Sequence, residues 1–413
     1  MFRKVSFLAL VIVLALTAVG MGTPAAKAAD PLKIGLLSDQ TGALQQYGKE
    51  LERGFLLGLE YMTEGKLEVA GRTIEVIIKD TANKPEVGAS LARELVEKDG
   101  AEVLVGSPSS GVTLQLMQAA VDQDVILMAG PAASPAITST GFNLNTFRAC
   151  RNSAQDYMAL STVLKDLKLS KVIIFAADYE FGRSSAAAAE AAYKALGLEV
   201  LPSIFAPLET TDFTPYIQQI LDSGADALQP IWAGDVVTMN KQFVELKVQD
   251  KLTIIQAMNS NPIMKAGATP DIVAAQPIGY IVYHYTLPKT EVNDALVKMH
   301  TEKYEGEFPD LFTECGFATA QALVKALEAS EGDTTPEKLG AALEGLTWEG
   351  PRGTYTLRAA DHQALMPMYI VRLTNIDDPE FKFYDLVAEI PTEQVTPMCA
   401  LPEAFKDRCE TMK

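Results

Sequence analysis

The sequence predicts an α/β protein built from two doubly wound, Rossmann-like lobes joined by hinge crossings. Short β-branched runs alternate with longer stretches of helical periodicity along almost the whole chain. Such alternation implies parallel strands connected by helices that cover both faces of a sheet. The alternation comes in two series that meet near residue 150. The 413 residues, 48% of them hydrophobic, suffice for two or three domains with large cores.

The two series define the expected elements. In the first, strands are expected at residues 33–37, 73–80, 103–105 and 125–128, and helices at 48–62, 85–98 and 111–121. In the second, strands are expected at 172–176, 200–205, 227–231 and 253–256, and helices at 157–167, 184–196, 213–222 and 236–246. Helices at 316–329 and 336–343 return to the first pattern, and 368–373 and 381–387 have the pattern of antiparallel or edge strands.

This order implies a chain that passes between the lobes more than once. We expect residues 30–150 with about 282–352 to form the first lobe and 151–281 with about 353–390 to form the second. Residues 391–413 are expected to be a C-terminal tail. The crossings are expected near 148–152, 279–283 and 350–354, where element ends can absorb a hinge motion. Open parallel sheets bind ligands at the carboxyl ends of their strands, so two facing lobes would enclose a ligand between them.

The N-terminus has the pattern of a secretory signal peptide over residues 1–28. Arg3 and Lys4 precede an apolar run at 5–19, and Ala26-Lys27-Ala28 has the small-x-small form of a cleavage site. A transmembrane anchor is the alternative, but the run is shorter than the roughly 20 residues of a span. With 53 acidic against 35 basic residues, the net charge would repel phosphates, which disfavours nucleic acid as a partner. We expect an exported, acidic protein.

Motifs for catalysis or cofactor binding are absent from the sequence. Neither a P-loop nor a Gly-x-Gly-x-x-Gly follows a strand. His284, His300 and His362 lack the spacing of metal ligands, and no Cys-x-x-Cys occurs. Ser109 and Ser110 do not meet the Gly-x-Ser-x-Gly spacing of a nucleophile elbow. The sequence therefore predicts no catalytic residues, no metal and no cofactor, and favours a binding protein over an enzyme.

Two small-residue loops are candidates for holding an anion. Residues 106–111 lie between an expected strand and helix, and residues 129–135 follow the next strand. Hydroxyls and unpaired N–H groups at such positions suit a carboxylate. The alternative is that the loops form only tight turns and an N-cap.

The four cysteines fall into two groups. Cys399 and Cys409 lie close together in a proline-flanked tail, which predicts a local disulfide in an oxidising compartment. Cys150 and Cys315 both sit beside apolar residues, and we expect them to be buried thiols rather than a bridge.

An ordered series of short motifs resembles one known family over nearly the whole mature chain. The motifs are Ile34-Gly35-Leu36-Leu37-Ser38-Asp39-Gln40-Thr41-Gly42, Tyr47-Gly48, Gly54, Glu60, Val69-Ala70-Gly71-Arg72, Lys79-Asp80-Thr81, Pro85, Ala89, Val105-Gly106 through Ser110, Pro131-Ala132-Ala133-Ser134, Phe147-Arg148, Asp178-Tyr179-Glu180-Phe181-Gly182, Gly224-Ala225-Asp226-Ala227 and Asp361-His362-Gln363. Together they resemble the periplasmic solute-binding proteins of ABC transporters, leucine/isoleucine/valine-binding type, which have a type I periplasmic-binding fold.

The resemblance implies roles for particular residues. Ser110, the Ala132 backbone and Ser134 would hold a ligand carboxylate. Tyr47 would wall the pocket, although it could simply cap the first helix. Phe181 would close on the ligand from the second lobe, although it could belong to the core.

The second lobe departs from the pattern of amino-acid binders. Phe181 stands where they often have Tyr, and Asp235 is the one nearby acid that could pair with an α-ammonium. If Asp235 faces the cleft, an amino acid can bind. If it faces solvent, the pocket suits a carboxylic acid with an apolar or aromatic body, held by Trp232 and Phe181.

The resemblance also implies what the protein does. It would be a periplasmic, monomeric binding protein that captures a small carboxylate-bearing solute and delivers it to ABC permease membrane subunits. The first expectation for the ligand is a branched-chain or related amino acid. The alternatives are an aromatic or aliphatic carboxylic acid in the same role, or a periplasmic sensor that regulates a partner.

Overall fold

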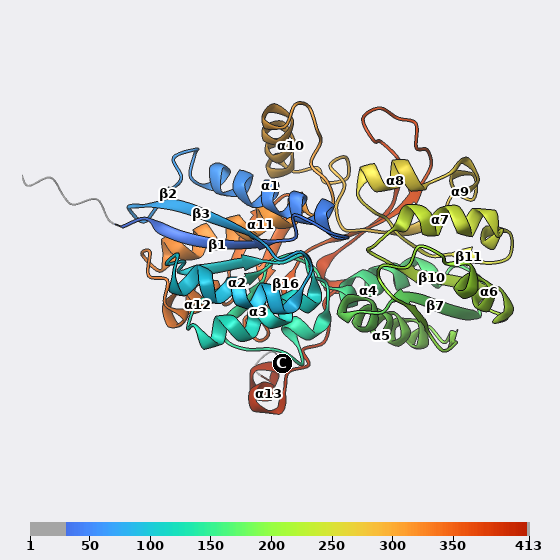
Figure 1. Ribbon diagram of the computed structural model, residues 1–413, viewed down its shortest axis with the longest axis horizontal. Helices are drawn as coiled ribbons and strands as arrows, with labels where there is room; N and C mark the ends of the chain where they lie inside the picture. The colour runs from blue at the N-terminus through green and yellow to red at the C-terminus, as the bar shows by residue number, and fades with distance from the viewer. Residues whose placement is uncertain (1–29, 411–413) are drawn as a thin grey trace, which may run out of the picture.

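The computed structural model of the protein describes residues 30–410, which form two lobes lying side by side (Figure 1). The expected signal peptide at residues 1–28 lies outside the described residues. None of the helices described is long and apolar enough to cross a membrane. The two-lobed α/β architecture is the one predicted from the sequence.

The first lobe is built on a six-stranded sheet. In spatial order its strands are β2 (Glu68–Val69), β3 (Arg72–Asp80), β1 (Leu32–Ser38), β4 (Val103–Gly106), β5 (Ile126–Ala129) and β6 (Thr146–Arg148). Every neighbouring pair is parallel except β2–β3, as expected for strands joined by helical crossovers. The carboxyl ends of β1, β4 and β5 all point toward the second lobe (Figure 1).

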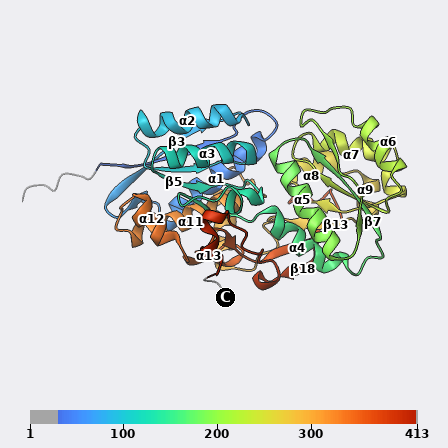
Figure 2. The same ribbon diagram turned by 90° about the horizontal axis from the view of Figure 1, so that it is seen from below.

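Helices cover both faces of this sheet (Figure 2). α2 (Pro85–Glu97) and α3 (Ser110–Asp122) share one buried apolar cluster with one face. α1 (Gln45–Met62), α11 (Thr313–Ala329) and α12 (Pro336–Leu343) share another with the opposite face. The first lobe therefore takes two of its helices from late in the sequence.

Glycine allows α1 and α11 to pack closely. A Cβ atom at Gly54 would lie 1.9 Å from the Thr313 carbonyl oxygen, and one at Gly58 would lie 2.7 Å from the Phe317 carbonyl oxygen. Any side chain at these positions would push the helices apart. The close contact holds the segment before α11, including Phe312, against the start of α1.

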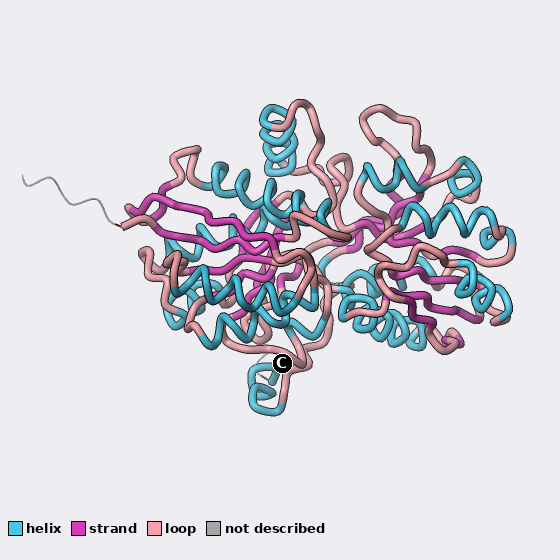
Figure 3. The backbone as a smooth tube through the Cα atoms, viewed as in Figure 1, coloured by secondary structure: helices cyan, strands magenta, loops and turns pink. Residues whose placement is uncertain are grey.

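The second lobe contains two sheets that meet at one strand. The first has the order β11 (Thr253–Ile254), β10 (Ala227–Ile231), β7 (Lys171–Ala177) and β8 (Glu199–Val200), with β9 (Ile204–Ala206) also on β7. The second has the order β12 (Gln256–Ala257), β13 (Ile278–Ile281), β17 (Met368–Leu373) and β18 (Tyr384–Ile390). Because Ile255 alone separates β11 from β12, the two sheets form one layer (Figure 3).

Helices also cover both faces of this layer (Figure 2). They are α4 (Ser153–Leu164), α5 (Glu180–Ala195), α6 (Thr214–Asp222), α7 (Val236–Glu245), α8 (Asn261–Gly267) and α9 (Pro270–Ala274). Buried residues of α4 and α5 share an apolar cluster with β7 and β17. Buried residues of α6 and α7 share another with the opposite face of β7 and β10.

The chain crosses between the lobes in three segments, one of them later than expected. Residues 149–152 join β6 to α4, and residues 282–290 join β13 to α10 (Glu291–Lys303), which packs on α1. The third crossing lies at 366–367, between β16 (Ala364–Leu365) and β17. The sequence predicted this crossing near 350–354, and that prediction is wrong. The first lobe extends to about residue 366 and not to about residue 352.

Residues 350–353 form a hairpin turn instead of a hinge. β14 (Thr347–Gly350) and β15 (Gly353–Leu357) pair antiparallel, and Gly353 has a φ of +100°. The rings of Trp348 and Tyr355 stack at 5.2 Å inside the core of the first lobe. Gly353, with its positive φ, therefore serves a tight turn and not a crossing.

The C-terminal tail returns to the first lobe as a fourth connection. Val395 is buried in the core of the second lobe, and the ring of Phe405 then packs at 5.1 Å from Phe142 of the first. Cys399 and Cys409, expected to pair, form a disulfide with their Cα atoms 5.6 Å apart. The disulfide closes the loop that precedes α13 (Lys406–Glu410).

Cys150 and Cys315 also form a disulfide, with Cα atoms 5.4 Å apart. Two buried thiols were expected from the sequence, and that expectation is wrong. Both residues are buried as expected, but the first crossing lies against the first turn of α11. The two positions are 165 residues apart, so only the tertiary structure reveals their proximity. The disulfide ties one hinge segment to the first lobe.

Candidate functional site

A narrow cavity of about 60 Å³ lies between the lobes. It is lined from the first lobe by Leu44, Tyr47, Pro108, Pro131, Ala133, Leu311 and Phe312, from the crossings by Arg151 and Val282, and from the second lobe by Tyr179, Phe181, Trp232, Ala233, Ala257, Met258, Asn259 and Tyr280. Its position at the carboxyl ends of β1, β4, β5, β7 and β10 is where open α/β sheets bind ligands. We therefore take this cavity as the candidate site.

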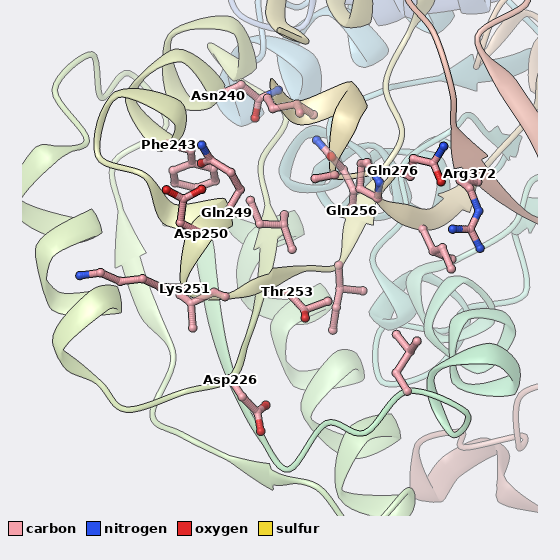
Figure 4. Close-up of a pocket in the computed structure, with 18 of the residues that line it drawn as sticks. Asp226, Asn240, Phe243, Gln249, Asp250, Lys251, Thr253, Gln256, Gln276 and Arg372 are labelled. Carbon is pink, nitrogen blue, oxygen red and sulfur yellow. The ribbon is translucent and has the colours of Figure 1, made fainter. Parts of the chain in front are cut away.

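A larger hollow of about 470 Å³ lies wholly in the second lobe. Figure 4 shows its polar and charged lining, which includes Asp226, Asp250, Lys251 and Arg372. It opens beside β11, and no residue of the first lobe contributes to it. A hinge motion of the two lobes would leave this hollow unchanged, so it does not fit the site that the fold predicts.

Aromatic rings form a large part of the walls of the interlobe cavity. Six of the 17 lining residues are aromatic: Tyr47, Tyr179, Phe181, Trp232, Tyr280 and Phe312. The ring of Tyr47 meets that of Phe312 edge-on at 5.0 Å, and the Trp232 indole stacks on Phe175 at 5.4 Å. The Trp232 Nε1 atom is buried and has no hydrogen-bond partner among the described residues. The cavity thus offers flat apolar surfaces.

Arg151 carries the one charge among the residues that line the cavity. Its side chain is buried, its Nη1 donates to the Pro131 carbonyl oxygen at 3.1 Å, and its guanidinium lies 5.7 Å from the centre of the Phe312 ring. The Nε atom has no hydrogen-bond partner in the described part of the chain. A guanidinium fixed in this way is suited to a carboxylate, which it can bind with two parallel hydrogen bonds.

Asp156 of α4 lies behind Arg151. One Asp156 carboxylate oxygen is 3.4 Å from Arg151 Nε, and the side chain is inaccessible to solvent. Neither oxygen has a hydrogen-bond partner among the described residues. Burial raises the pKa of Asp156 to about 6, although the positive charge of Arg151 opposes the rise. The carboxylate and the guanidinium form a buried ion pair at the edge of the cavity.

Arg148 holds the loop that follows β5. Its Nη1 donates to the carbonyl oxygens of Ala132 at 3.0 Å and Ser134 at 2.7 Å, and its Nε donates to Gln363 Oε1 at 2.9 Å. Burial, together with the nearby charge of Arg151, lowers the pKa of Arg148 to about 9. The buried guanidinium fixes the loop, and with it Pro131 and Ala133 in the cavity wall.

Hydrogen bonds between side chains connect the lobes across the cleft. The Tyr47 hydroxyl donates to Asn259 Oδ1, and the Ser134 hydroxyl donates to Glu180 Oε1 at 2.8 Å. The lobes are therefore closed on each other, which explains the small volume of the cavity. A solute must enter by hinge opening at the crossings.

The structure brings three of the residues predicted from the sequence together in the cavity. Tyr47 lines it from the first lobe, and Phe181 and Trp232 line it from the second. Phe181 lies in the first turn of α5, because that helix begins at Glu180 rather than at the expected residue 184. The loop between β7 and α5 thereby presents Tyr179 to the same cavity.

The three residues expected to hold the carboxylate lie just outside this cavity. The Ser110 hydroxyl accepts a hydrogen bond from the Ser134 backbone N–H at 3.2 Å, and the Ser134 hydroxyl is engaged by Glu180. Ala132 is fully buried. Their sequence neighbours line the cavity instead, so the two loops do reach the site. In the closed protein the negative charge of Glu180 occupies the place predicted for the ligand carboxylate.

Asp235 does not face the cavity. It is the N-cap of α7, where its Oδ1 accepts from the Thr238 backbone N–H at 2.9 Å and its Oδ2 accepts from the Thr238 hydroxyl at 2.6 Å. The side chain is exposed. Asp235 therefore follows the second of the two alternatives drawn from the sequence, in which it faces solvent.

Sequence reasoning missed Arg151 and three aromatic residues that line the cavity: Tyr179, Tyr280 and Phe312. Arg151 could have been identified from the sequence. Arg148 and Arg151 lie among apolar residues at an expected crossing, just before the N-cap Asn152. A charge in a buried hinge segment needs a partner or a ligand. The aromatic residues gave no signal that distinguished them from ordinary core residues.

The two hinged lobes and the enclosed cavity define the class of two-lobed solute-binding proteins with the type I periplasmic-binding fold. Comparison with known proteins agrees: residues 31–378 match the family model described as periplasmic binding protein. The chain belongs to this family.

Particular relatives are similar over most of their length. A Leu/Ile/Val-binding protein homologue of Brucella suis is 27% identical, covering 88% of this chain and 94% of the relative. The crystal structure of an ABC-type branched-chain amino acid transporter from Rhodopseudomonas palustris is 31% identical with a TM-score of 0.73, covering 90% of this chain and 100% of that one. A solute-binding protein from strain BisB5 of the same species, in complex with 3,4-dihydroxybenzoic acid, is 23% identical with a TM-score of 0.77 and covers 88% and 98%.

Proposed function

We propose that this protein is the periplasmic solute-binding component of an ABC transporter and that its cleft closes on a small, amine-free carboxylate with an aromatic body. The role in transport is supported by family membership and by the names of the relatives. Capture in an interlobe cleft and delivery to permease membrane subunits account for the hinged architecture.

The ligand class rests on one observation: the cavity presents a single positive charge, Arg151, and no carboxylate. A buried α-ammonium without a paired charge would be very costly, and Asp235 does not line the cavity. A carboxylate, by contrast, finds Arg151. An aromatic ring can pack against Tyr179, Phe181 and Trp232. Each such ring pair contributes about 0.5–1.5 kcal/mol to the binding free energy beyond the contribution of the buried area.

A branched-chain or related amino acid is the second candidate. It is favoured by the Leu/Ile/Val-binding names of the relatives that span most of the chain. In that case the tyrosine hydroxyls and the Asn259 amide oxygen would have to accept the ammonium protons, with Tyr47 released from Asn259.

A ligand screen by thermal shift and calorimetry separates the candidates, because a solute that binds only the folded protein raises its melting temperature. Benzoate and hydroxybenzoates should bind, whereas leucine, valine and phenylalanine should not. Arg151→Lys should weaken benzoate binding about 10- to 100-fold, since a charged bidentate contact becomes a point charge. Arg183→Lys is the matched control, because Arg183 pairs with Asp178 outside the cavity. Tight binding of leucine with no binding of benzoate would overturn the proposed ligand class.

A further inference from the structure

Arg151 stands between the cavity and Asp156. It is on the lining of the cavity, and on the opposite side its Nε is 3.4 Å from the Asp156 carboxylate. Asp156 itself does not line the cavity. The charge that Arg151 offers to a solute is therefore already shared with an internal carboxylate.

No hydrogen bond among the described residues compensates the charge of Asp156. Its two oxygens are buried and accept no hydrogen bond from the described residues, so a negative charge there depends on nearby cations. Five charged or titratable groups act on it: Arg148 and Arg151 of the first crossing, Arg352 of the turn between β14 and β15, Tyr280 of β13 and Tyr157 of α4. Arg352 is itself engaged, with its Nε 3.6 Å from Glu314.

We propose that Asp156 is the residue that sets the charge of the solute the cavity accepts, and that a carboxylate binds at Arg151 together with the uptake of one proton by Asp156. The inference rests on the proposed function. The physical reason is that two carboxylates would share one guanidinium. When Asp156 is ionised it already pairs with Arg151, and a bound carboxylate would bring a second buried negative charge against the same guanidinium. When Asp156 is protonated, the charge of Arg151 is available to the solute.

This coupling fixes the direction of the pH dependence. In the empty protein the pKa of Asp156 is raised to about 6, and a bound carboxylate raises it further, because like charges disfavour ionisation. Below about pH 6 Asp156 is protonated in both states, and affinity is constant as long as the solute is ionised. Above it, binding takes up a proton, so affinity falls as the pH rises. We expect roughly tenfold weaker binding at pH 8 than at pH 6.

Calorimetry of the wild-type mature protein with benzoate tests this without a variant. Titration at pH 7 in two buffers of different ionisation enthalpy counts the protons taken up. An aromatic carboxylic acid has a pKa of about 4, like side-chain carboxyls, so its own titration lies below the window. Benzamide is the matched neutral probe, and any binding of it should take up no proton. Benzoate binding with no proton uptake would overturn the inference and leave the proposed function intact, whereas no benzoate binding would overturn both.

Asp156→Asn assigns the proton to this residue. The variant keeps the shape of the side chain and leaves Arg151 charged, so it should bind benzoate with an affinity that no longer changes between pH 6 and 8. At pH 8 it should bind about tenfold more tightly than wild type. Asp235→Asn, outside the cavity, should retain the wild-type pH dependence. Proton uptake that persists in folded Asp156→Asn would assign the coupling to another group and refute the role of Asp156.

Discussion

The disulfide between Cys150 and Cys315 should be the largest single covalent contribution to stability in this protein. It closes a loop of 165 residues, whereas the tail disulfide closes one of 10. In the chain-entropy model a cross-link lowers the entropy of the unfolded chain in proportion to the logarithm of loop length, which gives about 5 kcal/mol for the long loop and about 3 kcal/mol for the short one. We therefore expect Cys150→Ala/Cys315→Ala to be more destabilised than Cys399→Ala/Cys409→Ala.

Denaturant unfolding followed by tryptophan fluorescence measures both effects. The chain has two tryptophans, one in each lobe. Trp348 lies in the core of the first lobe and Trp232 in the cavity wall of the second, so Trp232→Phe and Trp348→Phe backgrounds report the lobes separately. The long-loop variant should shift the unfolding midpoint of the first lobe most, because Cys150 ties the first crossing to α11 of that lobe.

The control is to establish that periplasm-purified protein carries the disulfide. Mass spectrometry of a non-reduced digest should find the Cys150 and Cys315 peptides linked. Free thiols at both positions would refute the pairing. An unfolding free energy unchanged by Cys150→Ala/Cys315→Ala, in a protein shown to carry the bridge, would refute the loop-entropy reasoning.

Three further predictions concern the cleft, the start of α7 and the carboxylate of Glu344 at the end of α12. Tyr47→Phe removes the hydrogen bond to Asn259, so it should destabilise the closed arrangement by about 0.5–1.5 kcal/mol and increase the radius of gyration of the empty protein in small-angle scattering. Asp235→Ala removes the N-cap of α7, so it should lower stability by about 1 kcal/mol in thermal unfolding and leave the affinity for benzoate unchanged; a large loss of affinity would place Asp235 in the site. The hydrogen bond from His362 lowers the pKa of Glu344 to about 2, so this carboxylate stabilises the protein above about pH 4.5 and loses its effect as the pH falls toward 2. The stability difference between wild type and Glu344→Gln should shrink over that range, and a difference constant with pH would contradict this account.

The fold could be predicted from the sequence because hydrophobic periodicity is a local property. Strands β1, β3, β4 and β5 appear within one or two residues of the expected positions, since β-branched runs flanked by turn residues decide them locally. The third crossing could not be placed in the same way. Glycines at 350 and 353 suit both a hinge and a hairpin turn, and the choice depends on the packing of Trp348 against Tyr355.

The site was predictable only in outline. Tyr47 and Phe181 were found because they belong to motifs of the family that the chain resembles, and Trp232 because it directly follows an expected strand. Arg151 was not, because its role depends on a cavity whose lining is drawn from segments spread along the chain from Leu44 to Phe312.

By itself the sequence determined the two-lobed α/β class, the tail disulfide and the place of the cleft, because each follows from patterns within a short stretch of chain. Only the tertiary structure decided the pairing of Cys150 with Cys315, the solvent-facing position of Asp235 and the charge of the cavity. These depend on which distant segments meet at the crossings. The desolvation of Arg151 and Asp156, and with it the chemistry of the site, arises only when both lobes close around them.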